Sequence, residues 1–158
     1  MNKLNYEQAL SYLAAYCSTG ERCIFDVRRK MEKWKIPSVQ QIEIIQKLQK
    51  ENFLDEERYC KAFVNDKSQY NRWGNYKIRY ELRKRQIPES LIRDSMETVN
   101  SEENLERLRQ LIEQKKKSVK GKNEWEIWQK LIRFAVGRGF SQKEVELAFG
   151  KEIMGLEP

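Results

Sequence analysis

The sequence has no histidine, and it holds only three prolines and seven glycines in 158 residues. Without histidine, the usual zinc sites and the Ser-His and Cys-His catalytic arrangements cannot be assembled. A glycine-rich phosphate loop, an aspartate-rich metal set and a serine in a nucleophile context are missing as well. An enzyme is therefore the least supported class, and the sequence predicts no catalytic residue, no cofactor and no metal.

Long apolar runs are also missing. No stretch approaches the roughly 18 apolar residues that a membrane span needs, and the first six residues lack a signal-peptide core. We therefore expect a cytoplasmic protein without a membrane partner. The cysteines, Cys17, Cys23 and Cys60, are odd in number and fall inside helical patterns, which predicts small buried apolar residues rather than metal or redox groups.

Positive charge is in excess, because 31 lysines and arginines face 24 acids and the net charge is +7. The excess clusters between Arg72 and Arg85. Ile78 and Leu82, four apart, predict a helix that packs on one side, and Gly74 and Pro88 mark its ends. A helix that is cationic on its other side predicts an acidic partner. The candidate filament- or DNA-binding residues are Arg72, Lys77, Arg79, Arg83, Lys84 and Arg85.

The same pattern occurs upstream, because Ile36 and Pro37 precede Ile87 and Pro88 by 51 positions. The matched pairs are Val27 with Ile78, Met31 with Leu82, and Arg28 with Arg79. A third, weaker copy runs from residue 131 to residue 141. Self-similarity near fifty residues predicts tandem modules, which we place at 1–54, 55–100 and 101–158, the last being degenerate. Arg28 and Arg29 of the first module are the second-ranked binding residues.

Apolar residues at three-and-four spacing predict nine helices in three triplets, and no strand pattern of period two is found. Capping-box spacing of Ser18 with Glu21, of Ser38 with Gln41 and of Ser141 with Glu144 predicts a helix start at each of these serines, or a few residues later in the case of Ser18. Asp55, Ser101 and Asn123 are the other predicted N-caps. Glu56 and Glu57 are expected in the first turn of the helix that follows Asp55, where their negative charge interacts favourably with the helix dipole. The stripe that contains Trp125 and Trp128 is expected in the core rather than as a base-stacking platform. The expected fold class is all-α: three tandem three-helix repeats forming an elongated, curved array.

Three segments carry a family resemblance. They are Tyr12-Leu13-Ala14 followed by residues 27–31, the run 53–64, which is similar to an apolar-Leu-Asp-Asp-x-Arg-Phe-Ala pattern, and the run 74–87 with Gly74, Lys77, Ile78, Arg79, Glu81 and Leu82. On these residues the chain resembles the RecX regulators of the RecA recombinase. The resemblance covers about residues 6 to 99 well and the rest only through the third repeat, where Ile132 replaces the repeated arginine.

The resemblance implies three tandem three-helix repeats and a partner, the RecA-type recombinase filament on single-stranded DNA. It implies modulation of the filament's ATPase and strand exchange, with inhibition as the expected direction. Direct contact with single-stranded DNA is implied too, and contact with double-stranded DNA is left open. We expect a monomer.

Two other functions stay open. One is a sequence-specific, helix-turn-helix-like DNA-binding regulator that uses the basic helix for recognition. Base readout favours Asn and Gln among the arginines, whereas only Asn75 and Gln86 flank this helix and neither is central. The other is an adaptor for proteins alone, which would show no salt-sensitive DNA binding.

Overall fold

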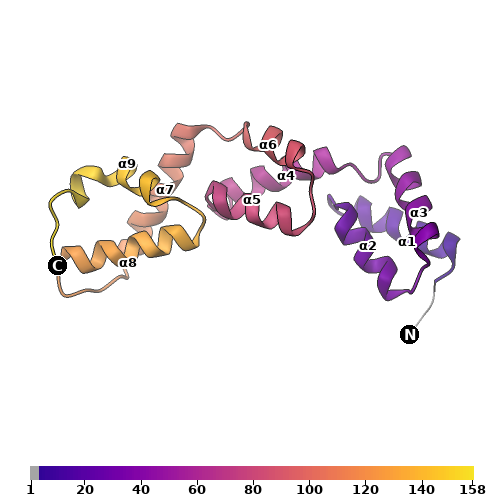
Figure 1. Cartoon of the computed structure of the whole chain (residues 1–158), viewed down its shortest axis with the longest axis horizontal. Helices are drawn as coiled ribbons and strands as arrows, with labels where there is room; N and C mark the ends of the chain where they lie inside the picture. Colours follow the sequence, from indigo (N-terminus) through magenta and orange to yellow (C-terminus); the bar gives the residue numbers. More distant parts are fainter. Residues whose placement is uncertain (1–3) are drawn as a thin grey trace. The chain divides into compact units, whose positions relative to one another are not determined.

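The computed structural model describes residues 4–158, and over these residues the chain is all α-helical (Figure 1). The helices are α1 Tyr6–Ser18, α2 Ile24–Lys33, α3 Ser38–Lys50, α4 Glu56–Gln69, α5 Asn75–Lys84, α6 Glu89–Met96, α7 Ser101–Lys116, α8 Glu124–Gly137 and α9 Gln142–Ile153. The predicted all-α fold class is confirmed. None of these helices combines the length and the apolar character that a bilayer crossing requires.

The chain divides into two compact units. The first comprises residues 4–62 and 82–92. In it, α3 packs against both α1 and α2. The apolar stripes that the spacing predicts supply its core, which includes Ala9, Leu13, Val27, Met31, Ile44 and Leu48, all fully buried.

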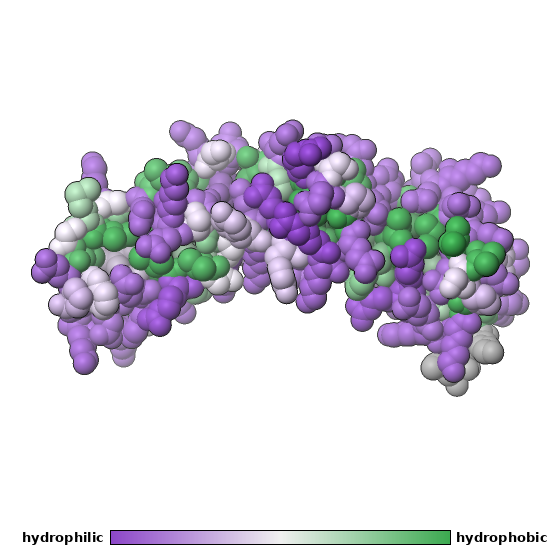
Figure 2. All heavy atoms as spheres, in the orientation of Figure 1, coloured by the Kyte–Doolittle hydropathy of each residue, from purple (hydrophilic) through white to green (hydrophobic). Residues whose placement is uncertain are grey.

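The second unit comprises residues 63–81 and 93–158. Here α7, α8 and α9 each pack against the other two. Their core includes Leu108, Ile112, Trp128, Leu131, Ala135, Phe140, Val145 and Phe149. Trp128 is buried, with its ring centroid 5.2 Å from that of Phe149, so its predicted place in a core is confirmed. In the view of Figure 2, hydrophilic side chains cover most of the surface of both units.

The middle helices of the three triplets, α2, α5 and α8, end in the same way. Each is followed by a residue in the left-handed region: Lys35 (φ 55°), Gln86 (φ 58°) and Gly139 (φ 98°). A buried apolar residue comes next: Ile36, Ile87 or Phe140. Its backbone N–H donates over 3.1 Å to the carbonyl of Met31, Leu82 or Ala135, as in a Schellman motif. The predicted match between the three copies therefore extends to their backbone hydrogen bonds.

The helix starts agree with the predicted caps at α4, α8 and α9 but not at α2, α3 and α7. Ser18 is the last residue of α1 and Cys23 is the N-cap of α2, while Ser38 is the first residue of α3 and follows the N-cap Pro37, so the two predicted capping boxes are wrong. The side chains of Asp55 and Asn123 accept hydrogen bonds from backbone N–H groups three residues on, and Ser141 forms a capping box with Glu144. The prediction that Ser101 caps α7 is wrong. Asn100 is the N-cap and accepts from the N–H of Glu103 over 3.0 Å.

The three cysteines are free and buried, as the sequence predicted. Burial raises the pKa of the Cys23 thiol to about 12, so that this sulfur stays protonated and unreactive at neutral pH. In residues 4–158, no group of three or more acidic, histidine or cysteine side chains is placed to hold a metal ion.

Candidate nucleic-acid and filament interface

Helix α5 carries most of the predicted basic site. Ile78 and Leu82 are fully buried and form the packed side of the helix, while Arg83 and Lys84 are exposed. Four of the six predicted residues lie on this helix: Lys77, Arg79, Arg83 and Lys84. Arg72 precedes it in the turn after α4, and Arg85 follows it in the turn before α6.

The two residues outside the helix are held differently from those on it. Arg72 has φ 54°, so its backbone makes the left-handed turn between α4 and α5, and its side chain is half-buried. Arg85 is also half-buried. It lies near Tyr59, whose pKa is raised by burial and by Cys23 and Asp26 while the Arg85 charge opposes the shift.

On α5 itself, two of the four cations have neighbours within the protein. The Lys77 ammonium lies 4.5 Å from the centroid of the Trp73 ring, and Lys67 lies 4.9 Å from the same ring. The Arg83 guanidinium binds Glu89 with two hydrogen bonds of 2.6 and 3.3 Å. This contact holds the pKa of Arg83 above its ordinary value. Lys84 is exposed and Arg79 is half-exposed, so these two are the most available to a partner.

Two exposed tyrosines on α5 were not among the site residues predicted from the sequence. Tyr76 and Tyr80 are each 63% exposed, and they lie four residues apart on a helix, hence on one face. With Val136 at the end of α8 they border an open groove of about 450 Å³. The signal was present in the sequence as two tyrosines off the apolar line of a basic helix. Such rings can stack on nucleic-acid bases.

In the first repeat, α2 presents a second cationic face. Val27 and Met31 are buried, while Arg28 and Arg29 are exposed. The Arg29 guanidinium lies 5.7 Å from the centroid of the Phe25 ring. Burial raises the pKa of Glu56, and the nearby Arg28 charge opposes that shift.

Cations also surround Tyr16, at the end of α1. Its ring has the guanidinium of Arg22 at 4.0 Å and the ammonium of Lys30 at 5.0 Å from the centroid. A cavity of about 180 Å³ opens beside the ring, lined by Tyr16, Asp26, Arg29, Lys30 and Lys33. Three of its five lining side chains are cationic, so this cavity suits an acidic group.

Comparison with known proteins bears on the helical repeats. Residues 55–96 match the family model described as "RecX, second three-helix domain", and residues 101–149 match "RecX, third three-helix domain". The chain is 30% identical over 134 residues to the "Regulatory protein RecX" of Haemophilus ducreyi, and the match covers 84% of each chain. The chain belongs to the RecX family. As a RecX family protein, it has the predicted repeated three-helix domains.

Two further relatives define the extent of the likeness. The "Regulatory protein RecX" of Bacillus cytotoxicus is 27% identical over 142 residues, which are 90% of this chain and 51% of that protein. The chain therefore spans about half the length of the Bacillus RecX that it matches. A solved structure titled "Crystal structure of regulatory protein RecX" superposes with a TM-score of 0.84 over 90% of this chain and 72% of the other, at 24% identity. This likeness shows the fold.

Proposed function

We propose that this RecX family protein binds the RecA-type recombinase filament on single-stranded DNA and lowers the rates of its ATPase and strand exchange. The observation that carries the proposal is the division of α5 into a buried apolar line and an outward face of cations and tyrosines. Membership of a family of regulatory proteins supports the regulatory role. The protein needs no chemistry of its own for this function.

The chemistry of the outward face suits a nucleoprotein. An arginine fork binds phosphate or carboxylate with two parallel hydrogen bonds, so Arg79 fits the DNA backbone as well as an acidic protein surface. Lys84 adds a mobile point charge, and the ring faces of Tyr76 and Tyr80 suit splayed bases. Arg28 and Arg29 on α2 offer the same contacts from the first repeat.

Inhibition follows if the protein prefers one state of the filament. A ligand shifts a conformational equilibrium only by its difference in affinity between the two states. A RecX protein that binds the less active filament state more tightly would lower ATP turnover without touching the ATP site. We propose that it acts as a cytoplasmic monomer built of three modules, 1–54, 55–100 and 101–158.

The first test is the ATPase rate of a recombinase preassembled on single-stranded DNA, titrated with this protein from sub-stoichiometric to equimolar ratios. We expect the rate to fall. An unchanged rate, together with tight binding to one duplex sequence over random duplex, would contradict the proposal and favour a sequence-specific DNA regulator.

The second test reverses charge on α5. Arg79→Glu with Lys84→Glu should weaken binding to the filament or to single strands by about tenfold or more, because two cations become repulsive. Arg83 is left intact, since its bidentate contact with Glu89 also holds the turn before α6. The matched control is Lys50→Glu with Lys151→Glu, which makes the same charge change at exposed positions of α3 and α9.

Salt dependence separates the two kinds of contact. If the phosphate backbone is contacted, log affinity for single strands should fall with log salt by about 0.7 per neutralised phosphate. The double reversal on α5 should reduce that slope, and the control pair should not. A slope that is flat in the unaltered protein would assign the basic face to protein contacts alone.

A further inference from the structure

A cavity of about 210 Å³ lies in the second unit, where the first turns of α5, α7 and α9 meet. Its lining residues are Asn75, Val99, Ser101, Asn104, Leu105, Glu144 and Leu147. No lysine or arginine lines it, although the protein as a whole is strongly basic. This cavity is separate from the cationic face of α5.

Two acceptor oxygens in this cavity have no hydrogen-bond partner among the described residues. Asn104 is only 3% exposed, and its Nδ2 donates to Glu144 Oε2 over 2.8 Å. A carboxylate can only accept, so this contact fixes the amide with its nitrogen toward Glu144 and leaves Oδ1 without a donor. The buried Oδ1 of Asn75 also lacks a donor. Buried acceptors without donors are costly, so this pair demands a donor-rich group.

The charge in the cavity selects a cation. Glu144 places a carboxylate inside the cavity. The helix starts do not call for an anion, because the α7 and α9 N–H groups already have the side chains of Asn100 and Ser141 as caps.

We propose that this cavity, the acceptor socket (Asn75, Asn104 and Glu144 with the walls Val99, Leu105 and Leu147), binds an arginine side chain of a protein partner. A guanidinium brings five N–H donors in one plane and is more weakly hydrated than an ammonium. The aliphatic stem of the arginine matches the apolar walls. A metal ion fits poorly because the socket has a single carboxylate, and that carboxylate, Glu144, repels a phosphate. The proposal is independent of the recombinase as partner.

The test uses the full chain and a short peptide, acetyl-Gly-Arg-Gly-amide, followed by two-dimensional ¹⁵N–¹H NMR. The side-chain amide signals of Asn75 and Asn104 and the backbone signals of residues 99–105 and 144–147 should shift and saturate. The same peptide with citrulline in place of arginine keeps the shape but loses the charge, so it should bind about tenfold more weakly or worse. Sodium chloride at equal ionic strength should produce no saturable shift.

Variants then identify the residues. Glu144→Gln keeps the capping partner of Ser141 but removes the charge, so it should lower the peptide affinity several-fold in a folded protein. Asn104→Leu removes the buried acceptor and should lower it further. The matched control is Asn65→Leu on an exposed face of α4 in the same unit. If Asn104→Leu does not fold, Glu144→Gln decides.

Four results would overturn the proposal. Shifts that never saturate would mean that the cavity holds solvent only. Equal binding of the arginine and citrulline peptides, or unchanged binding by Glu144→Gln, would mean that the positive charge of the ligand plays no part in binding. Tighter binding of free arginine than of the peptide would point to a small metabolite instead of a protein.

Discussion

The N-terminal ends of α2 and α5 meet the same requirement with different chemistry. At α2, the backbone N–H of Ile24 donates to a side chain, Glu56 Oε2, over 3.1 Å. At α5, the N–H of Tyr76 donates to a backbone carbonyl, that of Gly139, over 3.0 Å. The first N–H groups of a helix have no hydrogen-bond partner within the helix. At both ends, one of these groups donates to an acceptor in the next repeat. The α2 contact uses charges, whereas the α5 contact uses backbone alone.

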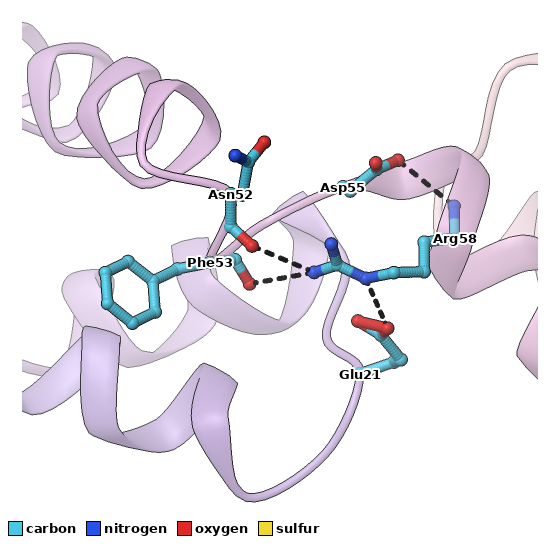
Figure 3. A network of polar contacts seen from close by, with 5 residues as sticks. All are labelled: Glu21, Asn52, Phe53, Asp55 and Arg58. Carbon is cyan, nitrogen blue, oxygen red and sulfur yellow. Dashed lines mark hydrogen bonds and ion pairs between the residues drawn. The ribbon is translucent and has the colours of Figure 1, made fainter.

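Charged side chains form a second network between the first two repeats, centred on Arg58 (Figure 3). Arg58 binds Glu21 through Nε, and its terminal nitrogen donates to the carbonyls of Asn52 and Phe53 over 3.1 and 3.5 Å. One guanidinium thereby ties the start of α4 to the end of α3 and to the loop before α2. The network is partly exposed, so salt and pH can act on it.

The α5 contact depends on close backbone approach instead. The N–H of Gly74 donates to the carbonyl of Arg138 over 2.8 Å. A Cβ on Gly74 would overlap the backbone of Gly139, and a Cβ on Gly139 would overlap Lys77. Both positions therefore require glycine, whereas the α2 contact and the network depend on the side chains of Glu56 and Arg58. The repeats therefore share a pattern of helices but contact one another through different chemistry.

Breaking the backbone contact should have the largest effect. Gly74→Ala should lower the free energy of unfolding by about 2–3 kcal/mol, because the new methyl group separates two hydrogen-bonded backbones. Chemical denaturation followed by circular dichroism measures it. Gly137→Ala is the matched control: its Cβ would meet nothing within 4 Å, so stability should stay equal or rise by up to about 1 kcal/mol. Equal stability of Gly74→Ala and the unaltered protein would show that the two backbones are not in contact.

Sequence periodicity could predict the buried positions of the repeated helices. Val27, Ile78 and Leu131 were matched by spacing, and all three are fully buried. The pairing of Gly74 with Gly139 could not be predicted, because a glycine carries no side-chain pattern and these two are far apart in the chain. The acceptor socket was missed for a related reason: Asn75, Asn104 and Glu144 come from three helices.

Cap chemistry was predictable only where one candidate stood alone. Asn123 had no competing neighbour, and it caps α8 as predicted. Asn100 and Ser101 are adjacent, and both can cap a helix, so the choice depended on where the backbone turns. Glu56 was placed correctly in the first turn of α4. Its tertiary partner, the N–H of Ile24, lies outside any local pattern.

Removing Arg58 should have the next largest effect. Arg58→Ala should lower the free energy of unfolding by about 1–2 kcal/mol, since two carbonyls and Glu21 lose a donor. The pair with Glu21 contributes less than about 1 kcal/mol of this, because both side chains are partly exposed. A double-mutant cycle with Glu21→Ala at low and high salt measures that part. Arg58→Lys keeps the charge but loses the fork, and full stability in it would contradict the role given to the carbonyl contacts.

Changes at Glu56 should be smaller and should depend on pH. Glu56→Ala removes the acceptor of Ile24 N–H and should lower the free energy of unfolding by about 1 kcal/mol. Burial raises the pKa of Glu56, while the Ile24 N–H and Arg28 oppose the shift. The folded state then holds this proton more tightly than the unfolded chain, so stability falls as pH rises just above the ordinary carboxyl range. Glu56→Gln should lose that part of the pH dependence in denaturation curves, and a pH profile identical to that of the unaltered protein would contradict it.

The smallest effects should come from the C-terminal ends of α2 and α5, which are alike where the N-terminal ends differ. Lys35→Gly and Gln86→Gly each relieve a left-handed backbone that disfavours side chains, but each also adds freedom to the unfolded chain. The two terms nearly cancel, so both variants should raise the free energy of unfolding by only about 0.5 kcal/mol, and by similar amounts. Denaturation midpoints measured side by side would reveal a difference. Unequal gains would mean that α2 and α5 also differ at their C-terminal ends. The difference between the two helices would then not be limited to their N-terminal contacts.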